Sequence, residues 1–413
     1  MYDLVIYNIG CLATPYGDSA KSGNAQRDVK FSENAYIAVQ DGLIKETGTG
    51  EYPEASEYLD AEGCLVTPGL IDAHTHLVFG GWRQNEMKMK LENVPYLDIL
   101  NAGGGIHSTV KATRSASKEE LTEKALKALD EMIGFGTTTC EAKSGYGLSL
   151  EEEVKQLEVI RDLNRIHAMD VVPTFMAAHA VPEEYRQQRS EYIRLICEEM
   201  IPYVSEHRLA EYCDVFCEKD VFDAQESKQI LETGKKFGLR AKIHADEIET
   251  IGGSVLAGEI GAVSAEHLIV CDQKGIEALA KGGTVACLLP ATSFYLGAKY
   301  AKAREMIRAG VPVAMASDFN PGSCPCLNMQ FVMNLGCLRY KMTPEEVLTA
   351  VTLNAAAAIG RAAVTGTAEP GKQADLVIWD AKDLNYLMYR LGSNLACRVI
   401  KRGRIVSNHE KVS

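Results

Sequence analysis

The chain has 413 residues, 46% of them hydrophobic, and its formal net charge at pH 7 is -13. This length is enough for one large α/β barrel and a smaller domain, and the acidity argues against general nucleic-acid binding. No apolar run reaches the length of a membrane span, and the first residues lack a basic leader and a cleavage site. We therefore expect a cytoplasmic protein without membrane contact, whose 12 cysteines are reduced.

Both ends of the chain predict short β-strands. The candidates are 2–7, 35–39, 43–47, 374–379, 398–400 and 404–406, and the turn Asp41-Gly42 joins the second to the third as a hairpin. Because two β-rich ends flank a different middle, we expect one small β-sandwich domain formed by residues 1–65 and 361–413.

The middle, residues 66–360, alternates strands with helices. The strand candidates are 70–74, 137–141, 171–176, 214–217, 240–244, 264–267, 284–289 and 311–318. Eight such strands predict an α/β fold of the (β/α)8 TIM-like barrel type. Helix starts support this pattern, since Ser117-x-x-Glu120 and Ser149-x-x-Glu152 have the form of capping boxes and Pro344 follows Thr343 at a first helical position.

Histidines and an aspartate fall at the ends of several predicted strands. His74 and His76 end the first strand, His244 ends the fifth, His267 the sixth and Asp318 the eighth. Residues i and i+2 of a strand point the same way, so His74 and His76 would lie side by side. An isolated His-x-His is as readily a pair of surface histidines, but four of the nine histidines at one rim favour a transition-metal site.

This pattern resembles the metal-dependent amidohydrolase superfamily over nearly the whole chain. The resemblance implies metal ligands at His74, His76, His244 and Asp318, and a substrate-orienting role for His267. Some members of the superfamily hold two metals through a carboxylated lysine at the end of the fourth strand. Lys219 is the only lysine nearby and lies past that end, so we expect one divalent metal, Zn or Fe(II).

A finer resemblance is to the imidazolonepropionase family. It rests on the stretches 79–83, 103–106, 143–147, 178–182, 244–247 and 318–323. It implies hydrolytic opening of the cyclic amide of 4-imidazolone-5-propanoate to N-formimidoyl-L-glutamate in histidine degradation, and a homodimer. The alternatives are a mononuclear deaminase of an aminated base such as cytosine or guanine, and a barrel that has lost activity and serves in assembly.

The expected reaction assigns roles to individual side chains. Asp318 would accept a proton from the attacking water, His267 in its protonated form would stabilise the oxyanion, and Glu247 would shuttle a proton. The anionic propionate of the substrate would be bound by Arg83, with Tyr146 and His179 completing the pocket. The ring heteroatoms would be bound by the loop residues Asn320, Gly322 and Ser323.

Overall fold

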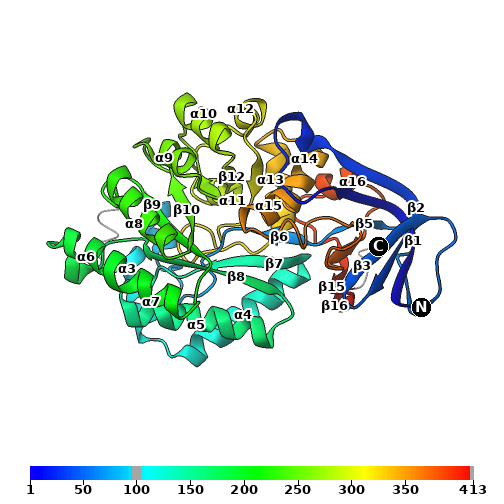
Figure 1. Ribbon diagram of the computed structural model, residues 1–413, viewed down its shortest axis with the longest axis horizontal. Coiled ribbons are helices and arrows are strands. Elements are labelled where there is room, and N and C mark those ends of the chain that lie inside the picture. Colours follow the sequence, from blue (N-terminus) through cyan, green and yellow to red (C-terminus); the bar gives the residue numbers. More distant parts are fainter. Residues whose placement is uncertain (93, 95–103, 410–413) are drawn as a thin grey trace.

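The computed structural model describes residues 1–92, 94 and 104–409. Figure 1 shows a barrel with helices around it and, on the right, a β domain that contains both ends of the chain. Within the described ranges, no helix is both long and apolar enough to cross a membrane. Gly103, in one of the family-like stretches, lies outside the described residues.

The barrel consists of eight parallel strands in consecutive order, β6 to β13. They are β6 (Leu70–Asp72), β7 (Thr137–Lys143), β8 (Asp170–Ala178), β9 (Tyr212–Cys217), β10 (Arg240–Ala245), β11 (Ser264–His267), β12 (Val285–Leu288) and β13 (Val313–Met315). The circle closes beyond β6 and β13, where Thr75 and Phe319 form a parallel bridge and the Asp318 N–H donates to the His74 carbonyl at 3.0 Å. The predicted barrel and all eight of its strands are therefore confirmed.

One boundary differs from the prediction. The apolar run before His74 is two strands, since β5 (Leu65–Pro68) pairs in the β domain and β6 belongs to the barrel. At Gly69, between them, an added Cβ would overlap the side chain of Thr138, so the chain passes too close to β7 for any side chain. β6 also ends at Asp72, so His74 and His76 lie past the strand and not on it, although Thr75 keeps them in register with Phe319.

Helices cover the outside of the barrel (Figure 1). The helices that the structure describes are α1 (Glu86–Leu91), α3 (Ile106–Ser115), α4 (Lys118–Gly134), α5 (Leu150–Ile166), α6 (Arg189–Leu195), α7 (Ile201–Glu206), α8 (Ala224–Lys236), α9 (Gly253–Ile260), α10 (Gln273–Gly282), α11 (Pro290–Tyr295), α12 (Ala303–Arg308), α13 (Met329–Leu338), α14 (Pro344–Ala350), α15 (Leu353–Ala358) and α16 (Leu384–Tyr389), with the shorter turns η1 (Gly23–Arg27), η2 (Glu183–Tyr185) and η3 (Ile196–Met200).

All three predicted helix starts are confirmed, but one of them lacks the predicted capping contact. Ser117 and Glu120 form a reciprocal capping box at α4, and Thr343 does the same at α14 with Pro344 in the first turn. Ser149 precedes α5, but its side chain makes no capping hydrogen bond. Instead Glu153, one residue further than the predicted partner, accepts hydrogen bonds from the loop before the helix.

The β domain is an eight-stranded sheet made by both chain ends, as predicted. Its strands are β1 (Tyr2–Pro15), β2 (Val29–Gln40), β3 (Leu43–Thr49), β4 (Ala55–Asp60), β5, β14 (Leu376–Trp379), β15 (Ala396–Lys401) and β16 (Arg404–Asn408). Buried residues of β2 and β14, such as Ile37 and Ile378, share one apolar cluster. The sheet therefore folds over on itself as a small sandwich. The boundaries 1–65, 66–360 and 361–413 stay a prediction, and β5 spans the first of them.

Candidate metal centre and active site

Four side chains converge where the predicted ligands were expected. His74, His76 and His244 bring nitrogen atoms within 4.8 Å of one another, and all three are buried. The Nε2 atoms of His76 and His244 are 3.4 Å apart. Asp318 Oδ1 lies 3.4 Å from His74 Nε2 and 3.7 Å from His76 Nε2. These donors can share one small ion, although they come from three widely separated parts of the chain.

Carboxylates on the far side of two rings set the tautomers. His74 Nδ1 is 3.0 Å from Glu266, and His244 Nδ1 is 3.1 Å from Asp214. Because a carboxylate accepts only from an N–H, the proton sits on Nδ1 and the Nε2 lone pair is free. His74 Nε2 is shielded from solvent and has no hydrogen-bond partner among the described residues. An unpaired nitrogen at this point is what a metal ligand requires.

Burial keeps the first two imidazoles neutral. The pKa values of His74 and His76 are lowered well below the usual value, chiefly by burial and then by neighbouring cationic groups. Since only the neutral ring can bind a metal, the environment prepares both ligands at neutral pH.

Asp318 is held by a residue that sequence reasoning missed. The Thr292 hydroxyl donates to Asp318 Oδ2 at 2.7 Å, which leaves Oδ1 towards the histidines. Thr292 lies in α11, after the seventh barrel strand. The backbone of Asp318 has φ 58°, and His267 has φ 68°, both in the left-handed region that side chains disfavour. Such conformations at two strand ends turn these side chains into the site and are typical of functional positions.

Below the histidines, the barrel interior contains a charged network that the sequence did not reveal. Lys143 Nζ lies 2.8 Å from Glu141 and 2.7 Å from Asp214, and Lys242 Nζ lies 3.1 Å from Glu141 and 3.5 Å from Glu266. All five side chains are fully buried. Burial would lower the pKa of Lys143, but Asp214 and Glu141 raise it overall, so the lysine is charged.

The formal charges of this region do not balance. With Asp318 included, four carboxylates face two lysines, an excess of two negative charges in a buried space. Buried charge is costly unless it is compensated. A divalent cation among the histidines would supply the missing charge, so the donor set and the charge both fit a metal.

His267 and Glu247 form a second pair beside the ligands. Their Nε2 and Oε2 atoms are 3.6 Å apart. Burial lowers the pKa of His267 to about 3 and raises that of Glu247 to about 7. The expected imidazolium at His267 is therefore not favoured, because the buried ring stays neutral, whereas Glu247 can gain or lose a proton near neutral pH.

Arg83, Tyr146 and His179 lie together beside the metal position. The His179 ring stacks on His76 at 4.8 Å between ring centroids, and the Tyr146 ring lies 5.7 Å from His76. The positive charge of Arg83 acts to lower the pKa values of Tyr146 and His179. Burial has a larger effect than Arg83 on each of these pKa values. The Arg83 side chain is 14% exposed and lies 3.7 Å from Glu86.

The loop after β13 is organised by Asn320. Its Oδ1 accepts from the N–H groups of Gly322 at 2.9 Å and Ser323 at 2.7 Å, and its Nδ2 donates to the Asp318 carbonyl at 2.7 Å. A Cβ at Gly322 would overlap the Arg83 guanidinium, so only glycine lets Arg83 occupy this position. The loop thus positions Arg83 and Asp318 together.

The loop after β7 depends on Glu153, another buried residue that the sequence did not single out. Glu153 accepts from the N–H groups of Gly145 at 3.1 Å, Gly147 at 2.9 Å and Leu148 at 2.8 Å. The Gly145 carbonyl lies 3.0 Å from His179 Nδ1, so the proton of His179 is on Nδ1 and its Nε2 is free. In the sequence, only the short spacing between the Gly-rich loop and the acidic first turn of α5 could have suggested the contact of Glu153 with this loop.

Lys219 lies away from the site, as its sequence position suggested. Its side chain is 55% exposed and pairs with Glu249 at 2.7 Å. It cannot bridge two metals at the histidines. All 12 cysteines are free thiols, as predicted.

Comparison with known proteins agrees with this geometry. The amidohydrolase family model matches residues 65–406. The chain is 49% identical to an imidazolonepropionase of Alkaliphilus metalliredigens over 420 aligned residues, covering 100% of each chain. It is 50% identical to an imidazolonepropionase of Streptococcus gordonii, covering 94% of each. A solved adenosine deaminase of Xanthomonas campestris with bound Zn has a TM-score of 0.72 at 18% identity, covering 98% of this chain and 92% of that one, which shows the fold alone.

Proposed function

The chain belongs to the imidazolonepropionase family of the amidohydrolases, and we propose that its cluster of His74, His76, His244 and Asp318 is the catalytic centre of that activity. The enzyme is a hydrolase that acts on the carbon–nitrogen bond of a cyclic amide. It opens the ring of 4-imidazolone-5-propanoate to give N-formimidoyl-L-glutamate in histidine degradation. The observation that carries the site assignment is the buried Nε2 of His74, which has no hydrogen-bond partner among the described residues and lies beside the other donors.

The same four residues would hold one divalent metal, Zn or Fe(II). Three imidazoles and one carboxylate suit either ion. Such an ion, when bound, lowers the pKa of a water towards neutrality and so supplies hydroxide. The exposed position of Lys219 supports a site that holds one metal ion and not two. The buried excess of two negative charges described above supports a charge of 2+.

The remaining residues bind the substrate and move its protons. Arg83 can bind the propionate through two parallel N–H donors, with Tyr146 and the free Nε2 of His179 beside it. The carboxylate of Asp318 accepts a proton from the attacking water. Protonated Glu247 supplies a proton to the departing ring nitrogen, and neutral His267 orients the carbonyl oxygen. Asn320, Gly322 and Ser323 act by shaping the loop at the ring end of the pocket.

A base deaminase is not favoured. An adenosine deaminase and a 5-methylcytosine deaminase among the similar structures are 18% and 16% identical, whereas the imidazolonepropionases are 49–50% identical along nearly the full chain. A neutral base would not need the partly buried Arg83 guanidinium. The intact ligand set likewise argues against a barrel without activity. A cytoplasmic location and a homodimer remain predictions, which cell fractionation and light scattering would test.

The first experiment measures hydrolysis of freshly generated imidazolone propionate as loss of the ring's ultraviolet absorbance, with metal content determined on the same sample. Arg83→Ala removes two charge-assisted hydrogen bonds, so we expect KM to rise about 100-fold while the metal stays bound. His244→Ala should lose both metal and activity. Arg165→Ala, on the exposed side of α5, is the control. An unchanged KM in Arg83→Ala would refute the carboxylate clamp, and no hydrolysis by the metal-loaded protein would refute the activity.

A further inference from the structure

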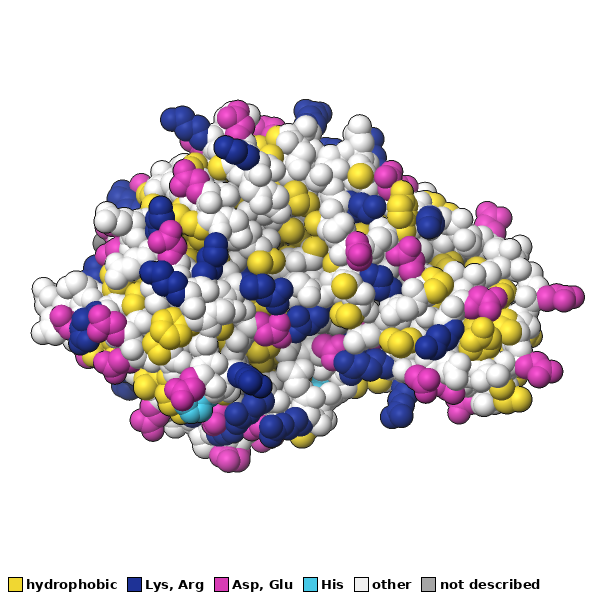
Figure 2. Space-filling model, in the orientation of Figure 1, with side chains coloured by type: hydrophobic (Ala, Val, Ile, Leu, Met, Phe, Trp, Pro, Cys, Tyr) yellow, Lys and Arg dark blue, Asp and Glu magenta, His cyan; other side chains and the backbone are white. Residues whose placement is uncertain are grey.

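A cavity lies at the opposite end of the barrel from the metal position. Its volume is about 380 Å³, and it is lined by the start of β8, the end of α5, the segment before β9 and parts of the C-terminal segment of the β domain. Because the metal ligands follow the carboxyl ends of the strands and this cavity lies at their amino ends, the two sites are separate. On the face of the molecule seen in Figure 2, Lys and Arg side chains lie around a hollow near the middle.

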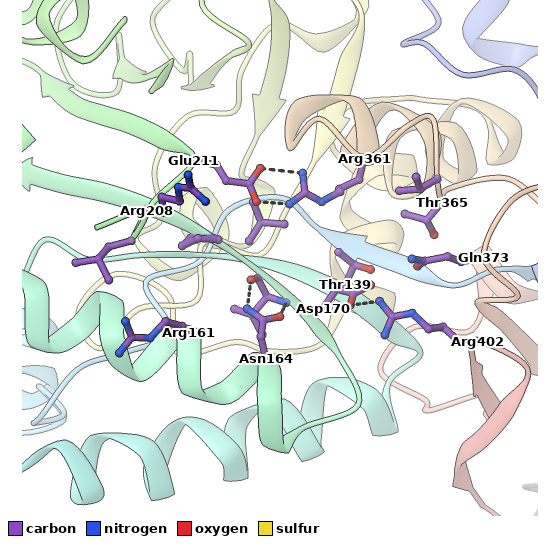
Figure 3. Close-up of a pocket in the computed structure, with 15 residues that line it drawn as sticks. Thr139, Arg161, Asn164, Asp170, Arg208, Glu211, Arg361, Thr365, Gln373 and Arg402 are labelled. Carbon is purple, nitrogen blue, oxygen red and sulfur yellow. Dashed lines mark hydrogen bonds and ion pairs between the residues drawn. The ribbon is translucent and has the colours of Figure 1, made fainter. Parts of the chain in front are cut away.

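The cavity lining is rich in arginine. It contains Arg161, Arg208, Arg361 and Arg402 but only two carboxylates, Asp170 and Glu211. Figure 3 shows Arg161 and Arg208 on one side of the cavity and Arg361 and Arg402 on the other. A local excess of two positive charges is unexpected in a chain whose net charge is -13. The lining therefore differs in charge from the rest of the protein.

The two carboxylates are already shared between several cations. Asp170 lies 2.6 Å from Arg402 and 2.8 Å from Lys401. Glu211 pairs with Arg361 and, at 2.9 Å, with Arg240. Each guanidinium has five N–H donors, so these pairs leave donors unused.

Two other arginines have spare donors as well. In the part of the chain that the structure describes, Arg208 has no carboxylate within ion-pair distance, and Arg161 Nε has no hydrogen-bond acceptor. Arg161 also lies 3.1 Å from Glu158 and, through its Nε, 3.9 Å from Asp162. The cavity thus has more donors than its own acceptors can satisfy.

The backbone at two of these arginines is in a conformation that side chains seldom adopt. Arg208 has φ 51° and Arg402 has φ 47°, the left-handed region in which Gly and Asn are favoured. Arg402 occupies the turn between β15 and β16, beside Gly403, and Arg208 follows the end of α7. Both turns place an exposed arginine at the same cavity.

We propose that this cavity binds a small doubly charged oxyanion, a dicarboxylate or a phosphate. Planar guanidinium groups match both kinds of anion through paired N–H donors. The volume lies at the lower end of the range for small-molecule sites, which suits a compact ligand. The site is independent of the catalytic assignment, because it shares no residue with the metal cluster.

The test titrates inorganic phosphate and succinate separately into the metal-loaded enzyme by calorimetry, at constant ionic strength, with acetate as the monoanion. We expect one of the two dianions to bind, and Arg208→Asn, which suits the left-handed backbone, to weaken it about tenfold or more. Arg194→Gln, which removes an exposed arginine from α6, should leave binding unchanged. Arg208→Asn should also keep the wild-type kcat.

Each alternative outcome is decisive. Arg83→Ala serves to separate the two sites, since a dianion held in the catalytic pocket would be lost in that variant and kept in Arg208→Asn. That pattern would overturn the proposal. So would acetate binding as tightly as the dianions, or the absence of binding by both phosphate and succinate. Which dianion binds decides whether the natural ligand is a phosphate or a dicarboxylate.

Discussion

His74 and His244 each have one ring nitrogen held by a buried carboxylate, and this contact sets which nitrogen faces the metal. Glu266→Gln keeps the shape of the His74 partner but removes its charge. We expect affinity for Zn²⁺ to fall about 10–100-fold, because the carboxylate orients the ring and raises its basicity. Titration of metal-free protein against a competing chelator measures this, with Glu277→Gln on exposed α10 as control. Equal affinity in both variants would mean that Glu266 does not support the ligand.

Glu247 is the residue whose ionisation should be visible in the rate. Burial raises its pKa to about 7, so the carboxyl is protonated below this pH and ionised above it. Since ring opening needs a proton at the departing nitrogen, kcat/KM should fall as the pH rises through about 7. The residual activity of Glu247→Gln should lack this descending limb in a profile over about pH 6–9. If kcat/KM of Glu247→Gln still falls as the pH rises, the ionisation of a residue other than Glu247 causes this fall.

At the scale of elements, helix starts depend on contacts that sequence patterns can misassign. Ser117 caps α4 through the Glu120 N–H, whereas Ser149 makes no such bond at α5. We expect Ser117→Ala to cost about 1 kcal/mol and to speed amide exchange in the first turn of α4, and Ser149→Ala to have little effect. Hydrogen exchange and the melting temperature of both variants test this. Similar losses in the two would contradict the assignment of the caps.

At the scale of the whole molecule, the barrel interior is a charged structure and not only an apolar core. Three carboxylates and two lysines are packed under the histidines, and with Asp318 beside the histidines the region has two negative charges in excess. Removal of a divalent ion should therefore destabilise the protein. At a metal concentration of 100 times Kd, bound metal adds about 2.7 kcal/mol, so we expect a melting temperature several degrees lower after chelation and recovery when Zn²⁺ is restored. An unchanged melting temperature would contradict a role for the ion in charge balance.

The sequence by itself determined the barrel and the rim at which the candidate ligands lie. Strand ends are local features, because an apolar run followed by His or Asp is visible over a few residues, and parallel strands bring those ends to one rim. His74, His76, His244, His267 and Asp318 were singled out on this ground, and the resemblance to the amidohydrolases then implied which four are ligands. Those four converge in the structure. The two-part β domain was likewise visible as short strands with tight turns at both ends of the chain.

Only the tertiary structure decided which residues support the ligands. Glu266 meets His74 across 192 residues of sequence, and Lys143 lies between Glu141 and Asp214. Charged residues in a strand ordinarily indicate a solvent-facing side, so their burial inside the barrel could not be read from the pattern. The division of one apolar run into β5 and β6 also follows from which sheet each half pairs with. Pairing across a closed barrel is a long-range property, and no local sequence signal encodes it.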